Sequence, residues 1–388
     1  MRALFATCRL IALATFVVAM LWPAPGEPAR ASTTKTRVYI STYGSDRDGI
    51  YLAELDPITG DLQLIRLAAA VNNVQFLALH PNHRYLFATC DVDEYPDTKG
   101  GAVAALKIDT TTGSLTRLNH QSAHGELPCH LTVDRHGKHA LVANYTGGSV
   151  AVLPIRADGT LKSATSTVVH QGSSVDKVLQ SGPHAHAINL DAANRFALVA
   201  DLGLDKVLIY RFDAAAGTLA PNEPSALAVA PGAGPRHIAF HPNGKWVYVI
   251  NELDSTVIAL RYDSTAGVLT LMDTVSTLPA GATVENITGE IVVHPNGKFL
   301  YGSNRGHDSI ALFAIDQTTG RLTSLGHFPA GGRTPRHFNI DPSGKILLSA
   351  NMDSDSVTVH QIDVPTGKLS RLAHEIKVLQ PQCIEFLP

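Results

Sequence analysis

The sequence predicts an all-β chain that folds as a seven-bladed β-propeller with four antiparallel strands in each blade. Two repeated turn signatures and the two ends of the chain carry this prediction. The first signature is a tight turn between two short β-runs, rich in Pro, Asn and Gly. Its copies begin about 47 to 57 residues apart, at His80, Asp134, Asp191, His241, His294 and Asp341. That spacing is typical of propeller blades.

The second signature is an Asp followed after a few polar residues by a Gly, just before an apolar-polar run. An Asp can cap such a turn, and Gly can adopt the positive φ that the next strand needs. There are seven copies, which predict seven blades: residues 56–60, 109–113, 157–159, 213–217, 263–267, 316–320 and 363–367.

Each repeat is expected to contain four strands. In the fifth repeat these are residues 237–240, 246–250, 256–262 and 268–275, which are rich in β-branched and aromatic residues and separated by Gly, Pro and Asn. No stretch shows a helical period with caps.

The two ends of the chain predict how the ring closes. Residues 37–43 match the second strand of a blade and have no first strand before them. The last residues, 383–388, match the first strand of the other repeats. They are therefore expected to supply the missing inner strand of the first blade, which removes two open sheet edges.

The N-terminus predicts export. Arg2 and Arg9 precede an apolar run over residues 10–22, and Ala29 and Ala31 provide a small-x-small cleavage site. We therefore expect a signal peptide over residues 1–31, a single propeller domain over 32–388, and a periplasmic or secreted protein. The alternative is that the apolar run stays as an anchor. No later run is long enough to cross a bilayer, so no membrane contact is expected after the signal is removed.

The net charge and the cysteines limit the binding partners that can be expected. The formal net charge is −3, which argues against nucleic acid and anionic membranes. Beyond the signal, Cys90, Cys129 and Cys383 are too few and too scattered for a disulfide framework or a zinc site. We expect a monomer without a cofactor.

The first residues of the inner strands should meet in the central channel. Aligning the repeats gives two sets of positions, the first being Gln75, Cys129, His186, Arg236, Gly289, Arg336 and Gln382. The next is Phe76, His130, Ala187, His237, Glu290, His337 and Cys383. His184 and Asn251 should lie on the same face. Polar residues that merely satisfy one another in a water-filled channel are the alternative to a binding site.

The chemistry of this set favours an anionic, oxygen-rich small molecule. Arginines bind carboxylate or phosphate in bidentate fashion, and a histidine or glutamate can move a proton. Five histidines (His130, His184, His186, His237 and His337) could suit a metal, but they come from different blades and the arginines would repel a cation. No nucleophile elbow of the G-x-S-x-G type occurs.

Several motifs also resemble those of the seven-bladed lactonase family of bacterial 6-phosphogluconolactonase type, whose distant relatives are carboxy-cis,cis-muconate cyclases. They lie at residues 172–174, 183–186, 201–207, 234–237, 251–253, 290–291, 294–297, 303–310 and 335–341. The resemblance covers essentially residues 38–388.

The resemblance implies hydrolysis of a small anionic sugar lactone without a metal or other cofactor. Matched by position, the family's funnel residues fall on His130, His184, His186, Arg236, Glu290 and Arg336. His184, His186 or Glu290 would activate the water that attacks the lactone carbonyl. Arg236 and Arg336 would hold the anionic group and the oxyanion.

We expect His130, His237, His337 and Asn251 to contact the substrate with Arg336. Two other functions stay open: a lyase or isomerase of the muconate cyclase type that opens or closes a lactone by proton transfer, and a propeller that binds a ligand or protein without catalysis.

Overall fold

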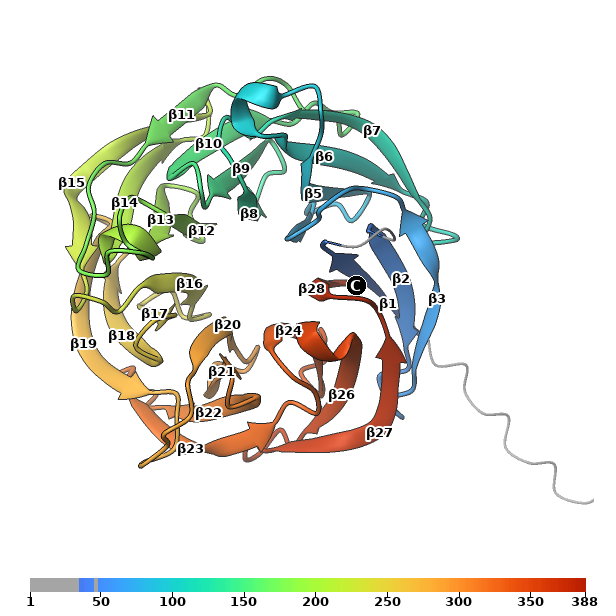
Figure 1. Cartoon of the computed structure of the whole chain (residues 1–388), viewed down its shortest axis with the longest axis vertical. Helices are drawn as coiled ribbons and strands as arrows, with labels where there is room; N and C mark the ends of the chain where they lie inside the picture. The colour runs from blue at the N-terminus through green and yellow to red at the C-terminus, as the bar shows by residue number, and fades with distance from the viewer. Residues whose placement is uncertain (1–34, 45–47) are drawn as a thin grey trace, which may run out of the picture. The chain divides into compact units, whose positions relative to one another are not determined.

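The computed structural model describes residues 35–44 and 48–388. These residues form seven four-stranded antiparallel sheets arranged around a central channel (Figure 1). The all-β, seven-bladed prediction is confirmed. The predicted signal peptide lies outside the described residues. Among those described, no helix is long and apolar enough to cross a membrane.

The blades follow one another along the chain. The first four comprise β28 (Pro381–Leu387), β1 (Thr36–Thr42), β2 (Ile50–Leu55) and β3 (Leu62–Ala69); β4 (Leu77–Leu79), β5 (Tyr85–Asp91), β6 (Gly101–Ile108) and β7 (Leu115–Ser122); β8 (Pro128–Val133), β9 (His139–Asn144), β10 (Ser149–Pro154) and β11 (Ser166–Val169); and β12 (Ala185–Leu190), β13 (Phe196–Asp201), β14 (Lys206–Asp213) and β15 (Thr218–Ala228).

The last three blades have the same order. They comprise β16 (Pro235–Phe240), β17 (Trp246–Asn251), β18 (Thr256–Asp263) and β19 (Val268–Ser276); β20 (Ile287–Val293), β21 (Phe299–Arg305), β22 (Ser309–Ile315) and β23 (Leu322–Pro329); and β24 (Pro335–Ile340), β25 (Ile346–Asn351), β26 (Ser356–Ile362) and β27 (Leu369–Lys377). Short 3-10 turns cover Pro96–Thr98 (η1), Leu202–Leu204 (η2) and Met352–Ser354 (η3).

The C-terminal strand closes the ring as the sequence predicts. Strand β28 pairs with β1, with Ile384 opposite Ile40 and Phe386 opposite Val38. These four side chains also pack against Leu348 and other core residues of the last blade. The first and last blades are thus joined both by backbone hydrogen bonds and by apolar packing.

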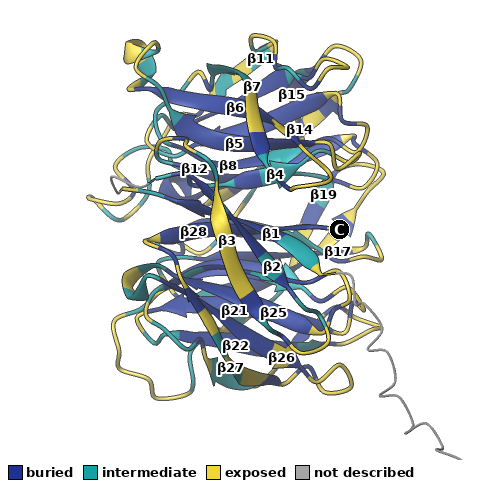
Figure 2. Ribbon diagram, turned by 90° about the vertical axis from the view of Figure 1, so that its right-hand side faces the viewer, coloured by how far each residue is buried: buried dark blue, intermediate teal, exposed yellow. Residues whose placement is uncertain are grey.

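The core lies between blades. The described residues form seven apolar clusters, and each cluster contains side chains from two neighbouring blades. The middle strands are buried on both faces, whereas the outer strands expose much of their surface (Figure 2). Because each blade needs its neighbours to bury its faces, the ring is expected to fold as a unit.

Histidines at the outer turns join the blades. His241 Nδ1 accepts the Asn243 N–H at 3.1 Å, so the ring proton lies on Nε2, which donates to the Gly297 carbonyl of the next blade at 2.8 Å. His294 makes the same two contacts, with Asn296 and Gly344. His80 does so with Asn82 and Gly137. These three histidines therefore join neighbouring blades.

Candidate active site

An irregularity at the start of the inner strands brings consecutive side chains to the channel. The pairing of β16 with β17 shifts register between Pro235 and His237, and β24 shifts between Pro335 and His337. Strands β8, β12 and β20 shift at the matching places. An extra residue at this point interrupts the pattern in which successive side chains of a strand point to opposite faces of the sheet. The first inner strand of the fifth repeat therefore begins at Pro235, two residues earlier than predicted.

Three arginines surround one carboxylate at this end of the channel. Glu252 Oε2 lies 3.0 Å from Arg236 Nε and 2.9 Å from Arg305 Nη2. Arg236 also donates to the Gly289 carbonyl at 2.8 Å, and Arg305 donates to the Thr288 carbonyl. We call Arg236, Arg305, Arg336, Glu252 and His186 the arginine layer.

Arg336 is the arginine of this layer without an ion pair among the described residues. Its Nη2 donates to Gln75 Oε1 at 3.0 Å. Burial and the neighbouring Arg236 and Arg305 lower the pKa of Arg336 to about 9. Burial likewise lowers the pKa of Arg305 to about 10. Three guanidinium groups thus lie near one carboxylate, and the layer carries a surplus of positive charge.

Glu252 stays ionised among these arginines. Burial alone would raise the pKa of its carboxyl group, but the Arg305, Arg236 and Arg336 guanidiniums outweigh burial, so the pKa is lowered. A carboxylate held in this way is a weak base. We therefore interpret Glu252 as the residue that positions Arg236 and Arg305.

Two histidines border the arginine layer. The His184 ring stacks on Tyr145 at 4.5 Å, and its Nδ1 lies 3.0 Å from the Tyr145 carbonyl oxygen. Because a carbonyl only accepts, Nδ1 carries the proton and the Nε2 lone pair is left free in the neutral ring. His186 lies deeper, with Nε2 3.8 Å from Glu252 Oε2. Burial, followed by Arg236 and His237, holds the pKa of His186 well below its usual value.

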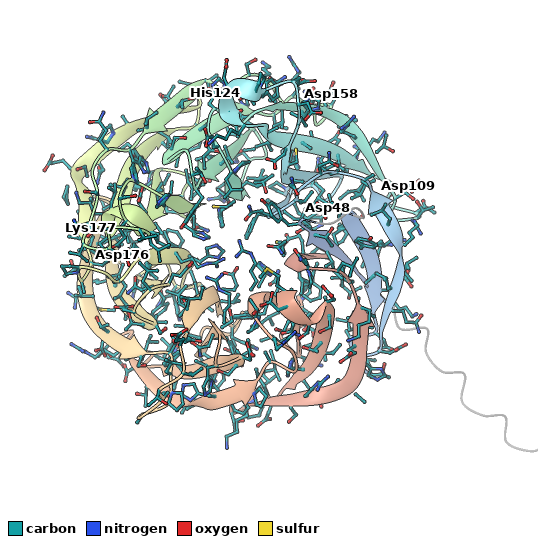
Figure 3. The ribbon with its side chains drawn as sticks, in the orientation of Figure 1. Asp48, Asp109, His124, Asp158, Asp176 and Lys177 are labelled. Atoms are coloured by element: carbon teal, nitrogen blue, oxygen red, sulfur yellow. The ribbon has the colours of Figure 1, made fainter. Side chains whose placement is uncertain are left out.

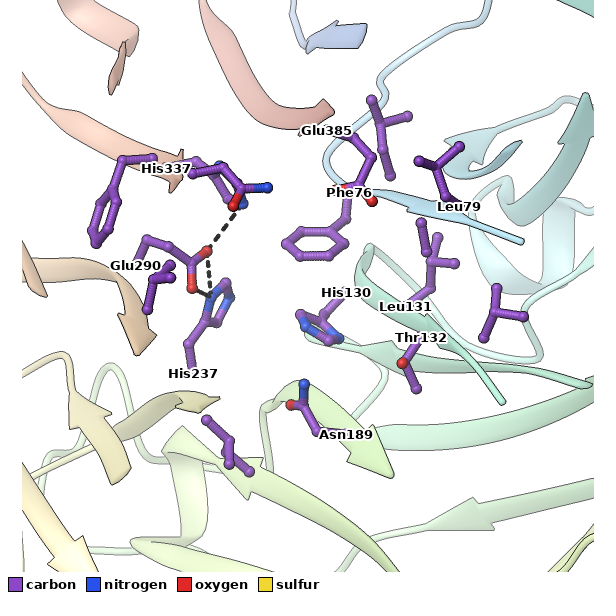
Figure 4. A pocket seen from close by; sticks show the side chains of 17 residues that line it. Phe76, Leu79, His130, Leu131, Thr132, Asn189, His237, Glu290, His337 and Glu385 are labelled. Carbon is purple, nitrogen blue, oxygen red and sulfur yellow. Dashed lines mark hydrogen bonds and ion pairs between the residues drawn. The ribbon is translucent and has the colours of Figure 1, made fainter. Parts of the chain in front are cut away.

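A second layer lies beside the first and contains a carboxylate between two histidines. The Glu290 oxygens lie 3.0 and 2.9 Å from His237 Nδ1 and 3.2 Å from His337 Nε2 (Figure 4). The Ile291 N–H donates to the same carboxylate at 2.9 Å. We call Phe76, His130, His237, Glu290 and His337 the histidine layer.

Backbone contacts fix the tautomers in the histidine layer. The Ile384 N–H donates to His337 Nδ1 at 3.3 Å, so the neutral ring carries its proton on Nε2, which lies 3.2 Å from Glu290 Oε2. His237 donates from Nδ1, and its buried Nε2 has no partner. Burial lowers the pKa of both His130 and His337 to about 4. The imidazoles are therefore neutral at pH 7, and Glu290 accepts hydrogen bonds from His237 and the Ile291 N–H.

Most of the predicted site residues come together. Side chains from the inner strands converge on the channel (Figure 3). The two layers touch, because the His186 and His237 ring centroids are 5.2 Å apart. The arginine layer and its border contain His184, His186, Arg236 and Arg336, whereas the histidine layer contains His130, His237, Glu290 and His337.

Asn251 is the candidate that the structure places outside these layers. Its amide donates to Thr256 Oγ1 on the neighbouring strand at 2.8 Å. Asn144, Asn304 and Asn351 hold equivalent positions in other blades and donate to Ser149, Ser309 and Thr358. The recurrence indicates that this asparagine closes a turn in each of those blades.

Four residues of the site were given no catalytic or binding role from the sequence: Gln75, Tyr145, Glu252 and Arg305. The repeat alignment placed Gln75 in the channel. Glu252 and Arg305 were recognisable as charged residues at the ends of second strands, facing the channel. Tyr145 follows such a strand too, and burial raises the pKa of its hydroxyl to about 12, so that it remains a hydrogen-bond donor.

The described residues hold no group of three or more His, Cys, Asp or Glu that could bind a metal ion. Cys90, Cys129 and Cys383 are free and buried.

The comparisons with known proteins define the class. Residues 37–386 match the family model described as "Lactonase, 7-bladed beta-propeller". The chain belongs to this family and is a lactone hydrolase. The resemblance predicted from sequence is confirmed.

Individual relatives agree with that class. The chain is 39% identical over 309 residues to a 6-phosphogluconolactonase of Bacillus subtilis, covering 79% of this chain and 86% of the relative. It is 35% identical over 296 residues to a 6-phosphogluconolactonase of Formosa agariphila, covering 76% and 82%. Among solved structures, a periplasmic gluconolactonase of Pseudomonas aeruginosa matches with a TM-score of 0.85 and 28% identity, over 91% of this chain and 99% of that one.

Proposed function

We propose that the protein hydrolyses a sugar lactone that carries an anionic group, as 6-phosphogluconolactone does. The observation that carries the proposal is the charge of the arginine layer, in which Arg236, Arg305 and Arg336 face the single carboxylate of Glu252. A phosphate or carboxylate on the substrate would compensate the surplus charge. The name 6-phosphogluconolactonase, carried by the relatives of Bacillus subtilis and Formosa agariphila, agrees with an anionic lactone. The name of the Pseudomonas aeruginosa gluconolactonase denotes a lactone without a phosphate.

Arg336 is the best candidate to bind the anionic group. Its guanidinium donates to a neutral amide and makes no ion pair among the described residues, so its charge is available to a ligand. Arg236 is held by Glu252 and by the Gly289 carbonyl, which fixes its position. A fixed guanidinium can stabilise the oxyanion that develops on the lactone carbonyl.

His184 is the proposed general base. Its Nε2 lone pair takes a proton as the water oxygen bonds to the lactone carbonyl carbon. The tetrahedral intermediate then breaks the bond between this carbon and the ring oxygen. The proton returns from His184 to that oxygen, which becomes the hydroxyl of the open-chain product, and the new carboxylic acid ionises in water.

His186 and Glu290 have other roles in this mechanism. The neutral His186 lies beside Glu252 and Arg236, where it can bind the substrate while the tetrahedral intermediate forms. Glu290 already accepts hydrogen bonds from His237 and the Ile291 N–H, and His337 Nε2 lies 3.2 Å from it. We therefore assign to Glu290 the positioning of the two histidines instead of proton transfer.

The turnover of 6-phosphoglucono-1,5-lactone, followed by acid release, tests this function. The wild-type protein should exceed the uncatalysed rate, and His184→Gln should lower kcat by a factor of about 100 to 10,000. His241→Gln, a change at an outer turn, is the matched control and should retain kcat. An unchanged kcat in His184→Gln would exclude this residue as the base. Failure of the wild-type protein on a panel of sugar lactones would overturn the function.

We also propose that residues 1–31 are a cleaved signal peptide and that the monomeric protein acts outside the cytoplasm. The charge and apolar pattern of this segment and the periplasmic relative of Pseudomonas aeruginosa support the proposal. N-terminal sequencing of the exported protein should begin at Ser32. Recovery of the protein with its first residues intact in the cytoplasmic fraction would contradict it.

A further inference from the structure

The channel has a second compartment on the other side of the histidine layer. A cavity of about 310 Å³ is lined by residues in the middle and final parts of the inner strands, together with the histidine layer (Figure 4). This volume lies at the lower end of the range for small-molecule sites. We call it the lower cavity, and its polar wall consists of Thr132, Asn189, Asn339 and Glu385.

The histidine layer separates this cavity from the arginines. Phe76 lies between three rings: its centroid is 4.2 Å from His130, 5.6 Å from His337 and 5.9 Å from His237. Glu290 connects His237 to His337. The four charged or polar members are at most 7% exposed, whereas Thr132, Asn189, Asn339 and Glu385 are partly exposed. Solvent therefore enters the lower cavity as far as the packed rings of the histidine layer.

The electrostatics of the two compartments differ. Neither Lys nor Arg lines the lower cavity, and the Glu290 carboxylate is already hydrogen-bonded by His237 and the Ile291 N–H. Burial raises the pKa of Glu385 to about 8, so that at pH 7 this side chain is a neutral hydrogen-bond donor. An anion would find no counter-charge here, whereas hydroxyl groups would find both donors and acceptors.

Two buried polar atoms of residues that line the cavity have no hydrogen-bond partner among the described residues. Asn189 Oδ1 and His237 Nε2 are both buried and unbonded. Asn339, at the equivalent position of another blade, is fully occupied, because its amide donates to the Ile384 carbonyl and accepts from the Ile340 N–H. A buried polar atom without a partner costs free energy unless a ligand or water satisfies it. Asn189 Oδ1 and His237 Nε2 lie behind the accessible wall of the cavity, whereas Phe76 provides an apolar ring surface.

We propose that the lower cavity is a second binding site, for a neutral polyhydroxylated ring such as an uncharged sugar or sugar lactone. Its hydroxyl groups would bond to the partly exposed side chains of Thr132, Asn189 and Glu385, and its apolar ring face would lie against Phe76. The site is distinct from the anion site of the arginine layer, which lies on the opposite side of the packed rings.

Binding of 1,5-anhydro-D-glucitol, a neutral ring that cannot be hydrolysed, tests the site by ligand-observed NMR and calorimetry. The wild-type protein should bind it with a Kd of roughly 1 to 10 mM. Asn189→Leu should weaken binding about tenfold, because the partly exposed polar amide is lost from the cavity wall. Thr132→Val, which keeps the shape of the side chain, should give a smaller loss and serves as a second variant if the first does not fold. Arg336→Gln should leave this affinity unchanged.

The binding results for the two variants show whether the sugar has its own site in the lower cavity or binds among the arginines. Loss of 1,5-anhydro-D-glucitol binding in Asn189→Leu and retention in Arg336→Gln would support the proposal. Loss in Arg336→Gln with retention in folded Asn189→Leu would show that the sugar binds among the arginines and would overturn it. The absence of saturable binding to the wild-type protein would overturn it as well. Because the probe is not a substrate, each result is independent of the proposed lactone hydrolysis.

Discussion

The outer turns and the channel use the same residue types in opposite ways. At the outer turns both ring nitrogens of His80, His241 and His294 are bonded, one to the turn and one to the next blade. In the channel His237 has a free nitrogen, and Arg336 makes no ion pair among the described residues. A polar side chain stabilises the ring when all its hydrogen-bonding atoms are paired within the protein. A polar side chain with an unpaired atom or charge is available to a ligand.

The largest effect is expected from removing strand β28, because both the outer turns and the channel depend on the closed ring. Deleting residues 383–388 removes most of β28 and therefore the pairing that joins the two ends of the chain. We expect loss of soluble, cooperatively folding protein, because β1 becomes an open edge. Size-exclusion chromatography and thermal melting would show this. A truncated protein with the parent melting temperature would contradict ring closure by β28.

Lowering the pH should reduce the stability of the protein mainly through the histidines of the channel. The unfolded chain protonates its histidines near pH 6.5, whereas burial lowers the pKa of His130 and His337 to about 4. Their contribution to stability is therefore complete above pH 6.5 and is lost as the pH falls toward 4. The loss is of the order of 3 kcal/mol for each histidine. Urea unfolding at a series of pH values measures it.

A variant checks the source of this pH dependence. His337→Gln keeps a donor near Glu290 and removes one titrating group. The slope of stability against pH between 4 and 6.5 should become shallower. An unchanged slope would show that His337 is not among the groups that cause the acid sensitivity.

A substitution at an outer turn should reduce stability without reducing catalysis. His241→Ala removes the 2.8 Å bond to Gly297 of the next blade and leaves a buried space, for a cost of about 2 kcal/mol. The free energy of unfolding should fall while kcat/KM for the lactone stays constant. A change in kcat/KM at temperatures where the variant is folded would show that the turns and the channel are coupled.

The smallest expected effect concerns one hydrogen bond between blades. The Tyr248 hydroxyl donates to the Gly320 carbonyl at 3.0 Å, as Tyr301 does to Gly367. Tyr248→Phe should cost about 1 kcal/mol. Chemical denaturation resolves such a difference. Equal stability of the two proteins would show that water replaces the hydroxyl at no cost.

The sequence predicted the architecture because the relevant signals are local and repeated. Turn residues recur at the blade period, and residues 383–388 match the other inner strands. The same alignment predicted that His186, Arg236 and Arg336 share one end of the channel, since equivalent residues of a repeat lie at equivalent heights.

The pairings within the channel could not be predicted in this way. Glu252 pairs with Arg305 of the next blade, and Glu290 with His237 and His337 on either side. Such partners depend on side-chain reach across the ring, which a repeat alignment does not give. The bulge that begins each of these inner strands and the closing of the channel at Phe76 are likewise properties of the assembled ring.

The central claim is that surplus positive charge in the arginine layer selects the substrate. It is tested most directly by the ratio of kcat/KM for 6-phosphoglucono-1,5-lactone to that for glucono-1,5-lactone, in the wild-type protein and in Arg336→Gln. The account predicts a preference of about a hundredfold for the phosphorylated lactone in the wild type and a ratio near one in the variant. Equal losses on both lactones, with the ratio preserved, would contradict it.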